Sequence, residues 1–146
     1  MVADWLKILG IDEIPQWDVL VFLHRHRTTL LSAEHIARLM CYAAGPVITA
    51  LDHLESKGII ERSRLSQGAR TYQMNHLTGS PGHAFLKLMD LAKSRAGRLA
   101  VTEELSKMRQ HATVSITAHV GKGKGKVDRK RRQSSGKGAQ KWLKAI

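Results

Sequence analysis

The chain has 146 residues, 42% of them hydrophobic, and a single cysteine, Cys41. This length suits one folded core. The lone cysteine excludes an internal disulfide and favours a reducing, cytoplasmic setting, and no apolar run approaches the ~20 residues of a membrane span. The formal net charge is +12, and residues 121–146 hold ten Lys/Arg against one acid, so the sequence predicts a polyanionic partner, with nucleic acid the first candidate.

Two helices separated by a break are predicted at the N-terminus. The apolar residues of positions 1–10 predict a short amphipathic turn or helix that ends at Gly10. Pro15 suits a helix start, and apolar residues recur at helical spacing from there to Arg27. The last turn of this second helix is basic, which favours the helix dipole, and a short β-prone connector follows it.

The next helix is predicted to begin at Ser32. A serine is a good N-cap because its hydroxyl accepts a hydrogen bond from a backbone amide of the first turn, and the acidic Glu34 lies in that turn. The residues expected on the buried face are Ile36, Ala37, Leu39 and Met40. Residues 42–45 are predicted to form the turn that follows, with Gly45 as its strongest helix breaker.

The helix over residues 45–57 is the centre of the predicted motif. Val47, Leu51 and Leu54 fall at i, i+4 and i+7, which places them on one inward stripe. The opposite face is then expected to carry small or polar residues: Pro46, Thr49, Ala50 and His53. Gly58 follows the last turn and fits the left-handed position that ends helices.

A two-stranded hairpin is predicted after this helix. Residues 59–65 and 70–74 are the strands, and residues 66–69 between them are turn formers. Helix, turn, helix and hairpin is the order of a winged helix-turn-helix. The expected fold class is therefore mainly α (α+β), a winged helix-turn-helix with a long C-terminal helical region and a disordered basic tail.

The C-terminal half is predicted to be helical before the tail. Residues 77–81 are expected to be a loop in which Ser80 caps a helical region that runs to about residue 110. The apolar stripes before and after Gly97 differ in phase, which predicts a kink or two helices. Residues 113–120 fit a short strand or the fraying end of a helix. The expected domains are 1–80, the winged domain; 81–120, a candidate dimerisation element; and 121–146, a basic flexible tail.

Two segments carry a family resemblance, residues 32–37 and residues 47–62, and a shorter match lies at residues 77–82. Together they make residues 15–95 similar to the winged-helix transcription regulators of the multiple-antibiotic-resistance regulator (MarR) family. The resemblance implies a homodimer, built from helices outside the DNA-reading motif, that binds double-stranded DNA at a near-palindromic site.

The candidate DNA contacts come from three parts of the chain. On the 45–57 helix, Thr49 and His53 are able to hydrogen-bond to base edges in the major groove, and Ala50 is able to contact a thymine methyl. Arginines of the hairpin would reach phosphates or the minor groove, and the basic tail would neutralise phosphates with counterion release. The full set is Pro46, Thr49, Ala50, His53, Lys57, Arg62, Arg64, Arg70, Lys122, Lys124, Lys126, Arg129, Lys130, Arg131 and Arg132.

The sequence has no motif for catalysis, a cofactor or a metal ion. It lacks a nucleophile elbow, a phosphate-binding loop and a carboxylate cluster, so we expect no enzyme. His24 and His26 are two residues apart on a predicted helix and face different directions, which is a poor spacing for a metal. Cys41 is interpreted as an oxidation sensor or as inert packing. A small-molecule effector has no support in the sequence.

Three functions fit these observations. The first is a transcriptional regulator that binds duplex DNA through the recognition helix at about residues 45–57 and a wing at about residues 59–74, with affinity aided by the tail. The second is a non-specific or architectural nucleic-acid-binding protein in which the tail does most of the binding. The third is a winged-helix module that binds another protein.

Overall fold

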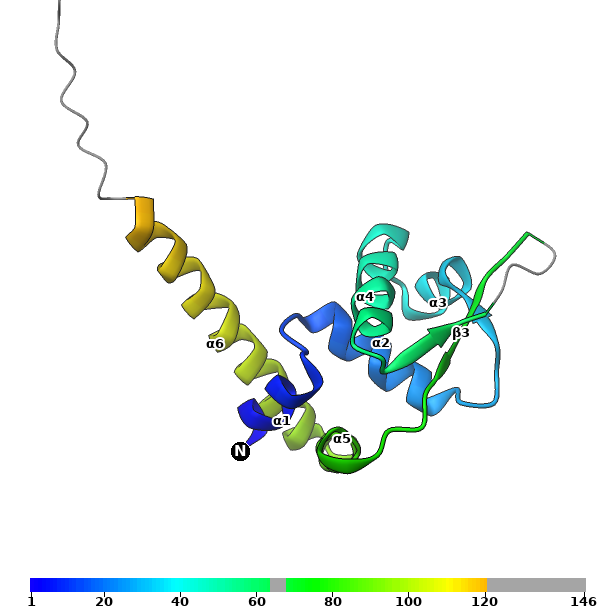
Figure 1. Cartoon of the computed structure of the whole chain (residues 1–146), viewed down its shortest axis with the longest axis horizontal. Coiled ribbons are helices and arrows are strands. Elements are labelled where there is room, and N and C mark those ends of the chain that lie inside the picture. Colours follow the sequence, from blue (N-terminus) through cyan, green and yellow to red (C-terminus); the bar gives the residue numbers. More distant parts are fainter. Residues whose placement is uncertain (64–67, 121–146) are drawn as a thin grey trace, which may run out of the picture.

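The computed structural model describes residues 1–63 and 68–120, and the surroundings of side chains as far as residue 115. Its elements, drawn in Figure 1, are α1 (Val2–Leu9), α2 (Ile14–Arg25), β1 (Leu31–Ser32), α3 (Ala33–Met40), α4 (Ala44–Ser56), β2 (Ile60–Arg62), β3 (Thr71–Met74), α5 (Gly79–Ala92) and α6 (Arg95–Val120). Helices dominate and one small antiparallel sheet accompanies them, so the predicted mainly α fold with a winged helix-turn-helix and a long C-terminal helical region is confirmed. The predicted basic tail, residues 121–146, lies outside the described residues. Among the described residues, no helix combines the length and the apolar character that crossing a membrane requires.

The sheet has three antiparallel strands in the order β1-β3-β2. Tyr72 of β3 is central, because it lies opposite Leu31 on one side and Arg62 on the other. The hairpin of β2 and β3, called the wing below, was predicted from two strand-like segments with turn-forming residues between them. The sequence marked β1 only as a β-prone connector, since two residues are too few to show alternation.

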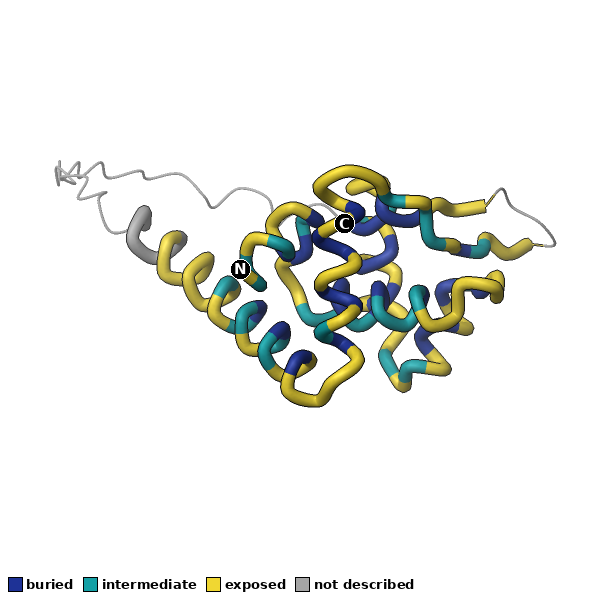
Figure 2. The backbone as a smooth tube through the Cα atoms, turned by 90° about the horizontal axis from the view of Figure 1, so that it is seen from below, coloured by how far each residue is buried: buried dark blue, intermediate teal, exposed yellow. Residues whose placement is uncertain are grey.

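The molecule has two parts that share one core. The head runs from α2 to β3 (residues 14–74), and in it α4 packs against α2 and α3. The platform consists of α1, α5 and α6, in which α1 packs against both of the other helices. Figure 1 shows α6 extending away from the head on the side opposite the wing, and Figure 2 shows that its distal turns are exposed. The domain boundary expected after residue 80 falls in the first turn of α5. Helix α1 lies before that boundary in the sequence but packs against α5 and α6, which follow it.

Three helices end in the same left-handed motif. A residue of positive φ follows each helix: Gly10 (69°) directly after α1, Cys41 (56°) directly after α3, and Gly58 (72°) two residues after the end of α4. In each case the next amide donates a hydrogen bond back to the carbonyl five residues earlier, for example from Ile59 to Leu54 at 3.0 Å. The two glycine stops were predicted. The stop at Cys41 was not, and Gly45, expected to break the chain there, lies inside α4.

Of the two alternatives predicted near Gly97, a kink or two helices, the structure has two helices, α5 and α6, joined by a short turn. The break falls at residues 93–94, and the Ser94 hydroxyl accepts a hydrogen bond from the Gly97 amide at 2.9 Å, which caps α6. Gly97 allows a close helix contact, because a Cβ there would lie 2.0 Å from the Leu91 carbonyl oxygen. The strand alternative for residues 113–120 was wrong, since α6 continues to Val120.

Three other expectations need correction. Helix α5 begins at Gly79 with Thr78 at the N-cap position, so Ser80 lies in its first turn and is not the cap. Leu39 was placed on the buried face of α3 but is 55% exposed, because that face is formed by Ala33, Ile36 and Ala37. Cys41 is exposed rather than packed.

His24 lies where the head meets the platform. Its ring contacts Phe85 of α5 edge-on, with centroids 5.2 Å apart. Burial lowers the pKa of His24, and the nearby charges of Arg27, Arg25 and Lys93 lower it further, so the neutral form is favoured at this joint.

Candidate nucleic-acid interface

The orientation of α4 decides which of its residues can meet a ligand. Its core stripe contains Val47, Leu51 and Leu54, as predicted, but also Ala50, which is only 2% exposed. Ala50 is inside because α4 packs against α2 as well as α3, and two neighbours bury a wider stripe than one. The assignment of Ala50 to an outward, base-contacting face was therefore wrong.

The wider core stripe turns the outward face of α4 toward a different set of residues. Gly45, Ile48, Thr49 and Asp52 are exposed and recur at i, i+3, i+4 and i+7. Thr49 is common to the predicted and the observed faces, and its hydroxyl donates a hydrogen bond to the Gly45 carbonyl at 3.1 Å. The sequence reasoning missed Asp52. Had Ala50 been included in the buried stripe, the opposite face of the helix would have contained Asp52.

The two remaining polar residues of α4 that were predicted to contact DNA face the α1–α2 junction. His53 is half-buried, and its Nε2 donates a hydrogen bond to the Gly10 carbonyl at 2.6 Å. The Lys57 side chain lies over the same glycine, so that a Cβ at Gly10 would meet Lys57 Cε at 2.9 Å. These contacts tie the C-terminal half of α4 to the loop that leaves the platform.

The first turn of α4, in contrast, is open to solvent. Pro46 is exposed there, as predicted, and a Cβ on Gly45 would have no heavy atom within 4 Å. The turn before it is held by Tyr42, whose hydroxyl donates a 2.5 Å hydrogen bond to Asp18 Oδ2 of α2. This hydrogen bond, with burial and the Asp18 charge, raises the pKa of Tyr42 to about 12.

The wing places two of the predicted arginines beside α4. Arg62 Nε lies 3.4 Å from Glu55 Oε2, which links β2 to α4, and both side chains are about one-third exposed. Arg70 is exposed just before β3. Within the hairpin, the Ser63 amide donates to the Thr71 carbonyl at 2.8 Å. The other predicted contacts, Arg64 of the wing and Lys122, Lys124, Lys126, Arg129, Lys130, Arg131 and Arg132 of the tail, lie outside the described residues.

A depression of about 410 Å³ separates α3 and α4 from the wing, and we call it the concave face. It is lined by Ala33, Glu34, Ile48, Asp52, Arg62, Gly68, Ala69, Arg70 and Tyr72. Ile48, Asp52 and Glu34 line it from the helices and are apolar or acidic, whereas Arg62 and Arg70 line it from the wing. This arrangement can accept polyanion charge on the wing side and amino groups on the helix side.

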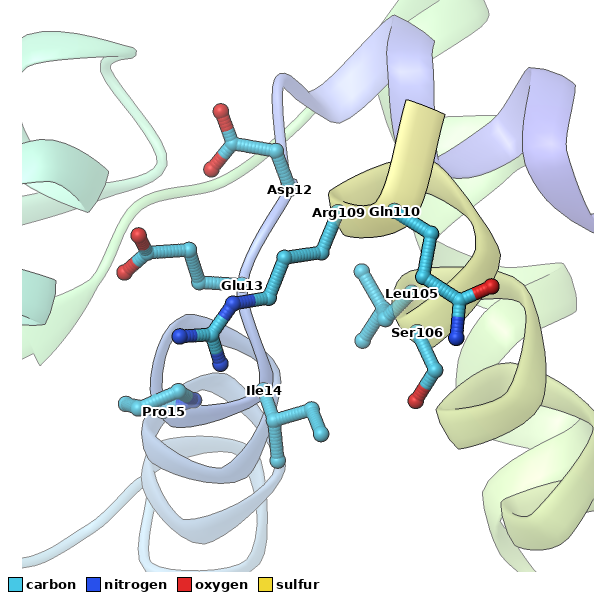
Figure 3. Close-up of a pocket in the computed structure, with 8 residues that line it drawn as sticks. All are labelled: Asp12, Glu13, Ile14, Pro15, Leu105, Ser106, Arg109 and Gln110. Carbon is cyan, nitrogen blue, oxygen red and sulfur yellow. The ribbon is translucent and has the colours of Figure 1, made fainter. Parts of the chain in front are cut away.

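A second cleft, of about 450 Å³, lies between the α1–α2 linker and α6. Figure 3 shows the Arg109 side chain reaching from α6 toward the linker that carries Asp12 and Glu13. Ile14, Pro15 and Leu105 add apolar walls. This cleft touches both head and platform. Within the described residues, no group of three or more His, Cys, Asp or Glu side chains is placed to hold a metal ion.

Comparisons with known proteins give a family match and similar solved structures. The MarR family model matches residues 13–72. The chain is similar to MepR, a transcription regulator of the Staphylococcus aureus multidrug efflux pump MepA, with 22% identity over 77% of this chain and 84% of that one and a TM-score of 0.46. A mutant of S. aureus MepR bound to an oligodeoxyribonucleotide gives 22% identity over 81% and 86%, with a TM-score of 0.48.

No curated protein matches the chain. The family match begins one residue before α2 and ends in β3, so it coincides with the head. Helix, turn, helix and wing follow one another within it in the predicted order. Residues 13–72 of this chain therefore match the MarR family model and have the element order of a winged helix-turn-helix.

Proposed function

We propose that this protein is a transcriptional regulator that binds duplex DNA as a homodimer, with α4 in the major groove and the wing along the backbone. The observation that carries the proposal is the concave face. It joins Ile48 and Asp52 of α4 to Arg62 and Arg70 of the wing, in the order that a winged helix uses to contact bases and phosphates. The MarR-type match over the same residues supports it.

The charge of the chain supports a nucleic-acid partner. The net charge is +12, and most of the excess lies in residues 121–146. Basic residues in such number neutralise phosphates without sequence preference, whereas α4 offers few strong base-reading side chains. We therefore assign specificity to α4 and much of the affinity to the wing arginines and the tail.

The exposed apolar residues of the platform support dimerisation. Ile8, Leu86, Leu99 and Val114 are large apolar side chains between 47% and 66% exposed. They lie on all three platform helices, and α6 extends well beyond the body of the molecule (Figure 1). A second copy that covers these helices would bury them and place two α4 helices for an inverted repeat.

The test is selection of bound sequences from a random duplex pool by the full chain. We expect an enriched inverted repeat, which reports specificity and dimer symmetry together. A pool that retains binding but shows no enrichment would instead identify a non-specific binder. A chain that retains no duplex at low salt would identify a protein-interaction module.

Two variants separate the contributions of the wing and the tail. Arg70→Ala should weaken binding to all duplexes and lower the salt slope by about one counterion, whereas the matched variant Arg95→Ala, an exposed arginine of α6, should change neither. Deletion of residues 121–146 should flatten the slope further. An unchanged slope in the deletion variant would remove the tail from the mechanism.

A further inference from the structure

Ile48 and Asp52 are one turn apart on α4 and both line the concave face. Ile48 is 38% exposed and Asp52 is exposed. Positions i and i+4 on a helix have Cβ atoms ~5–6 Å apart. That separation corresponds to roughly two base-pair steps of 3.4 Å along a groove. The pair is therefore able to touch neighbouring base pairs at once.

The charge of this part of the face is opposite to that expected of a phosphate site. Glu34 of the α3 first turn lies on the same face as Asp52. Arg62 on this face is paired with Glu55. Within the described residues, neither Glu34 nor Asp52 has a cation within ion-pair distance. Two carboxylates would repel phosphates, so this part of α4 suits the groove floor, where bases present amino groups.

The chemistry of base edges limits what a carboxylate accepts. Cytosine presents an N4 amino donor in the major groove with no acceptor of its own beside it. Adenine also presents an amino donor, but its N7 acceptor lies next to it and would repel the second carboxylate oxygen. Thymine presents its C5 methyl group, which gains contact with an apolar side chain such as Ile48.

We infer that Asp52 and Ile48 make α4 select pyrimidines on one strand of each half-site, Asp52 by accepting from cytosine N4 and Ile48 by packing on a thymine methyl one or two base pairs away. The inference rests on the proposed function and specifies the bases that it uses. Thr49 lies between the two positions, and its hydroxyl oxygen, which already donates to Gly45, retains acceptor capacity for a neighbouring base.

The experiment uses the full chain and the duplex that it enriches from a random pool. For Asp52→Asn, we expect the preferred base at one position of each half-site to change from cytosine to adenine, because an amide pairs with both N6 and N7 of adenine. Binding to random duplex should become tighter at the same time, because a negative charge has left the DNA-facing surface. The matched variant Asp90→Asn removes an equal charge from an exposed residue of α5, and should leave the preferred base unchanged.

The thymine contact is tested by replacing thymine with deoxyuridine, which removes only the methyl group. In the enriched duplex, this replacement at the contacted position should weaken wild-type binding about fourfold, the value of one buried methyl. Ile48→Ala should reduce that loss to less than twofold. Leu30→Ala, which truncates an exposed leucine in the α2–β1 connector, should retain the fourfold loss.

The outcomes separate this inference from the proposed function. If Asp52→Asn enriches the same sequence as the wild type, and Ile48→Ala loses as much affinity as the wild type on the deoxyuridine duplex, the inference is wrong. The proposed function as a transcriptional regulator then still stands. If the wild type enriches no sequence, the proposed function and the inference are both overturned. If Asp90→Asn also changes the preferred base, the inference is overturned, because the loss of one negative charge anywhere on the protein would then explain the change.

Discussion

The head and the platform use glycine in opposite ways. Gly45 lies in the first turn of α4, where a Cβ would meet no heavy atom within 4 Å. Gly97 lies in the first turn of α6, where a Cβ would come within 2.0 Å of the Leu91 carbonyl oxygen. Gly45 lies in open space at the start of α4, whereas Gly97 lets two helices of the platform approach closely.

This difference separates the parts of the molecule that are constrained by packing from those that are free to meet a ligand. Gly97 is buried and its amide is held by Ser94, while Arg98 donates to the Ala92 carbonyl at 2.9 Å across the same turn. In the head, the turn before α4 is held by the backbone hydrogen bonds that end α3 and by the hydrogen bond from Tyr42 to Asp18. The platform is therefore expected to tolerate fewer substitutions at its turn than the head does.

Alanine at the two glycines is the largest contrast that this comparison predicts. Gly97→Ala should lower the free energy of unfolding by about 2–3 kcal/mol, because the new methyl must separate α5 from α6. Gly45→Ala should raise it by at most about 0.5 kcal/mol, because alanine restricts the unfolded chain at an open position, whereas Pro46 disfavours a helical backbone in the residue before it. Urea denaturation of both variants measures the two signs. Equal destabilisation of both would show that the turn of α4 is as tightly packed as that of α6.

The sequence predicted the helices and the wing because their signals are local. Gly10 and Gly58 follow helices at positions that require positive φ, and Ser32 caps α3 by accepting from the His35 amide at 3.3 Å. Cys41 occupies the same kind of position as the two glycines without any local signal for it. The close approach at Gly97 joins two different helices, and the sequence showed only that the apolar phase changed nearby.

The candidate site was predicted less well than the fold, because its geometry depends on neighbours. A stripe at i, i+4 and i+7 gives a buried direction, but the second helix that packs on α4 rotates the free side away from Ala50 and toward Asp52. His53 and Lys57 were expected to contact DNA from their type and helix position. The structure turns them toward Gly10, a contact 43 residues away in sequence for His53, which no local pattern predicts.

The second prediction concerns the hydrogen bond that holds the turn before α4. Tyr42→Phe should lower the free energy of unfolding by about 1–1.5 kcal/mol, because a hydrogen bond to a charged group is lost at a half-buried site. Asp18→Asn should have a similar effect, and the double variant should be less destabilised than the sum of the two. Additive effects would mean that the two side chains stabilise the head independently.

The same hydrogen bond predicts a pH dependence. The pKa of Tyr42 is raised from an ordinary 10 to about 12, chiefly because its hydroxyl donates to Asp18. The neutral phenol is thus favoured in the folded state, so the stabilisation is complete below pH 10 and is lost as the pH rises from 10 to about 12. The difference in unfolding free energy between wild type and Tyr42→Phe should be constant below pH 10 and shrink above it.

The smallest expected effect compares the ends of the two helices of the motif. Cys41 and Gly58 occupy the same position in the same left-handed motif, with φ of 56° and 72°. A side chain is strained in that region, so Cys41→Gly should raise the free energy of unfolding by about 0.5 kcal/mol after the added freedom of the unfolded chain is subtracted. Gly58→Ala should lower it by about 1 kcal/mol, because no heavy atom lies within 4 Å of a Cβ there and only the backbone strain is added.

Cys41→Ala keeps the strain and serves as the control for loss of the thiol. If Cys41→Gly were destabilising while Cys41→Ala was neutral, the entropy of the unfolded chain would outweigh the backbone strain at Cys41. The end of α3 would then be determined by how the helix packs in the head and not by the residue at position 41.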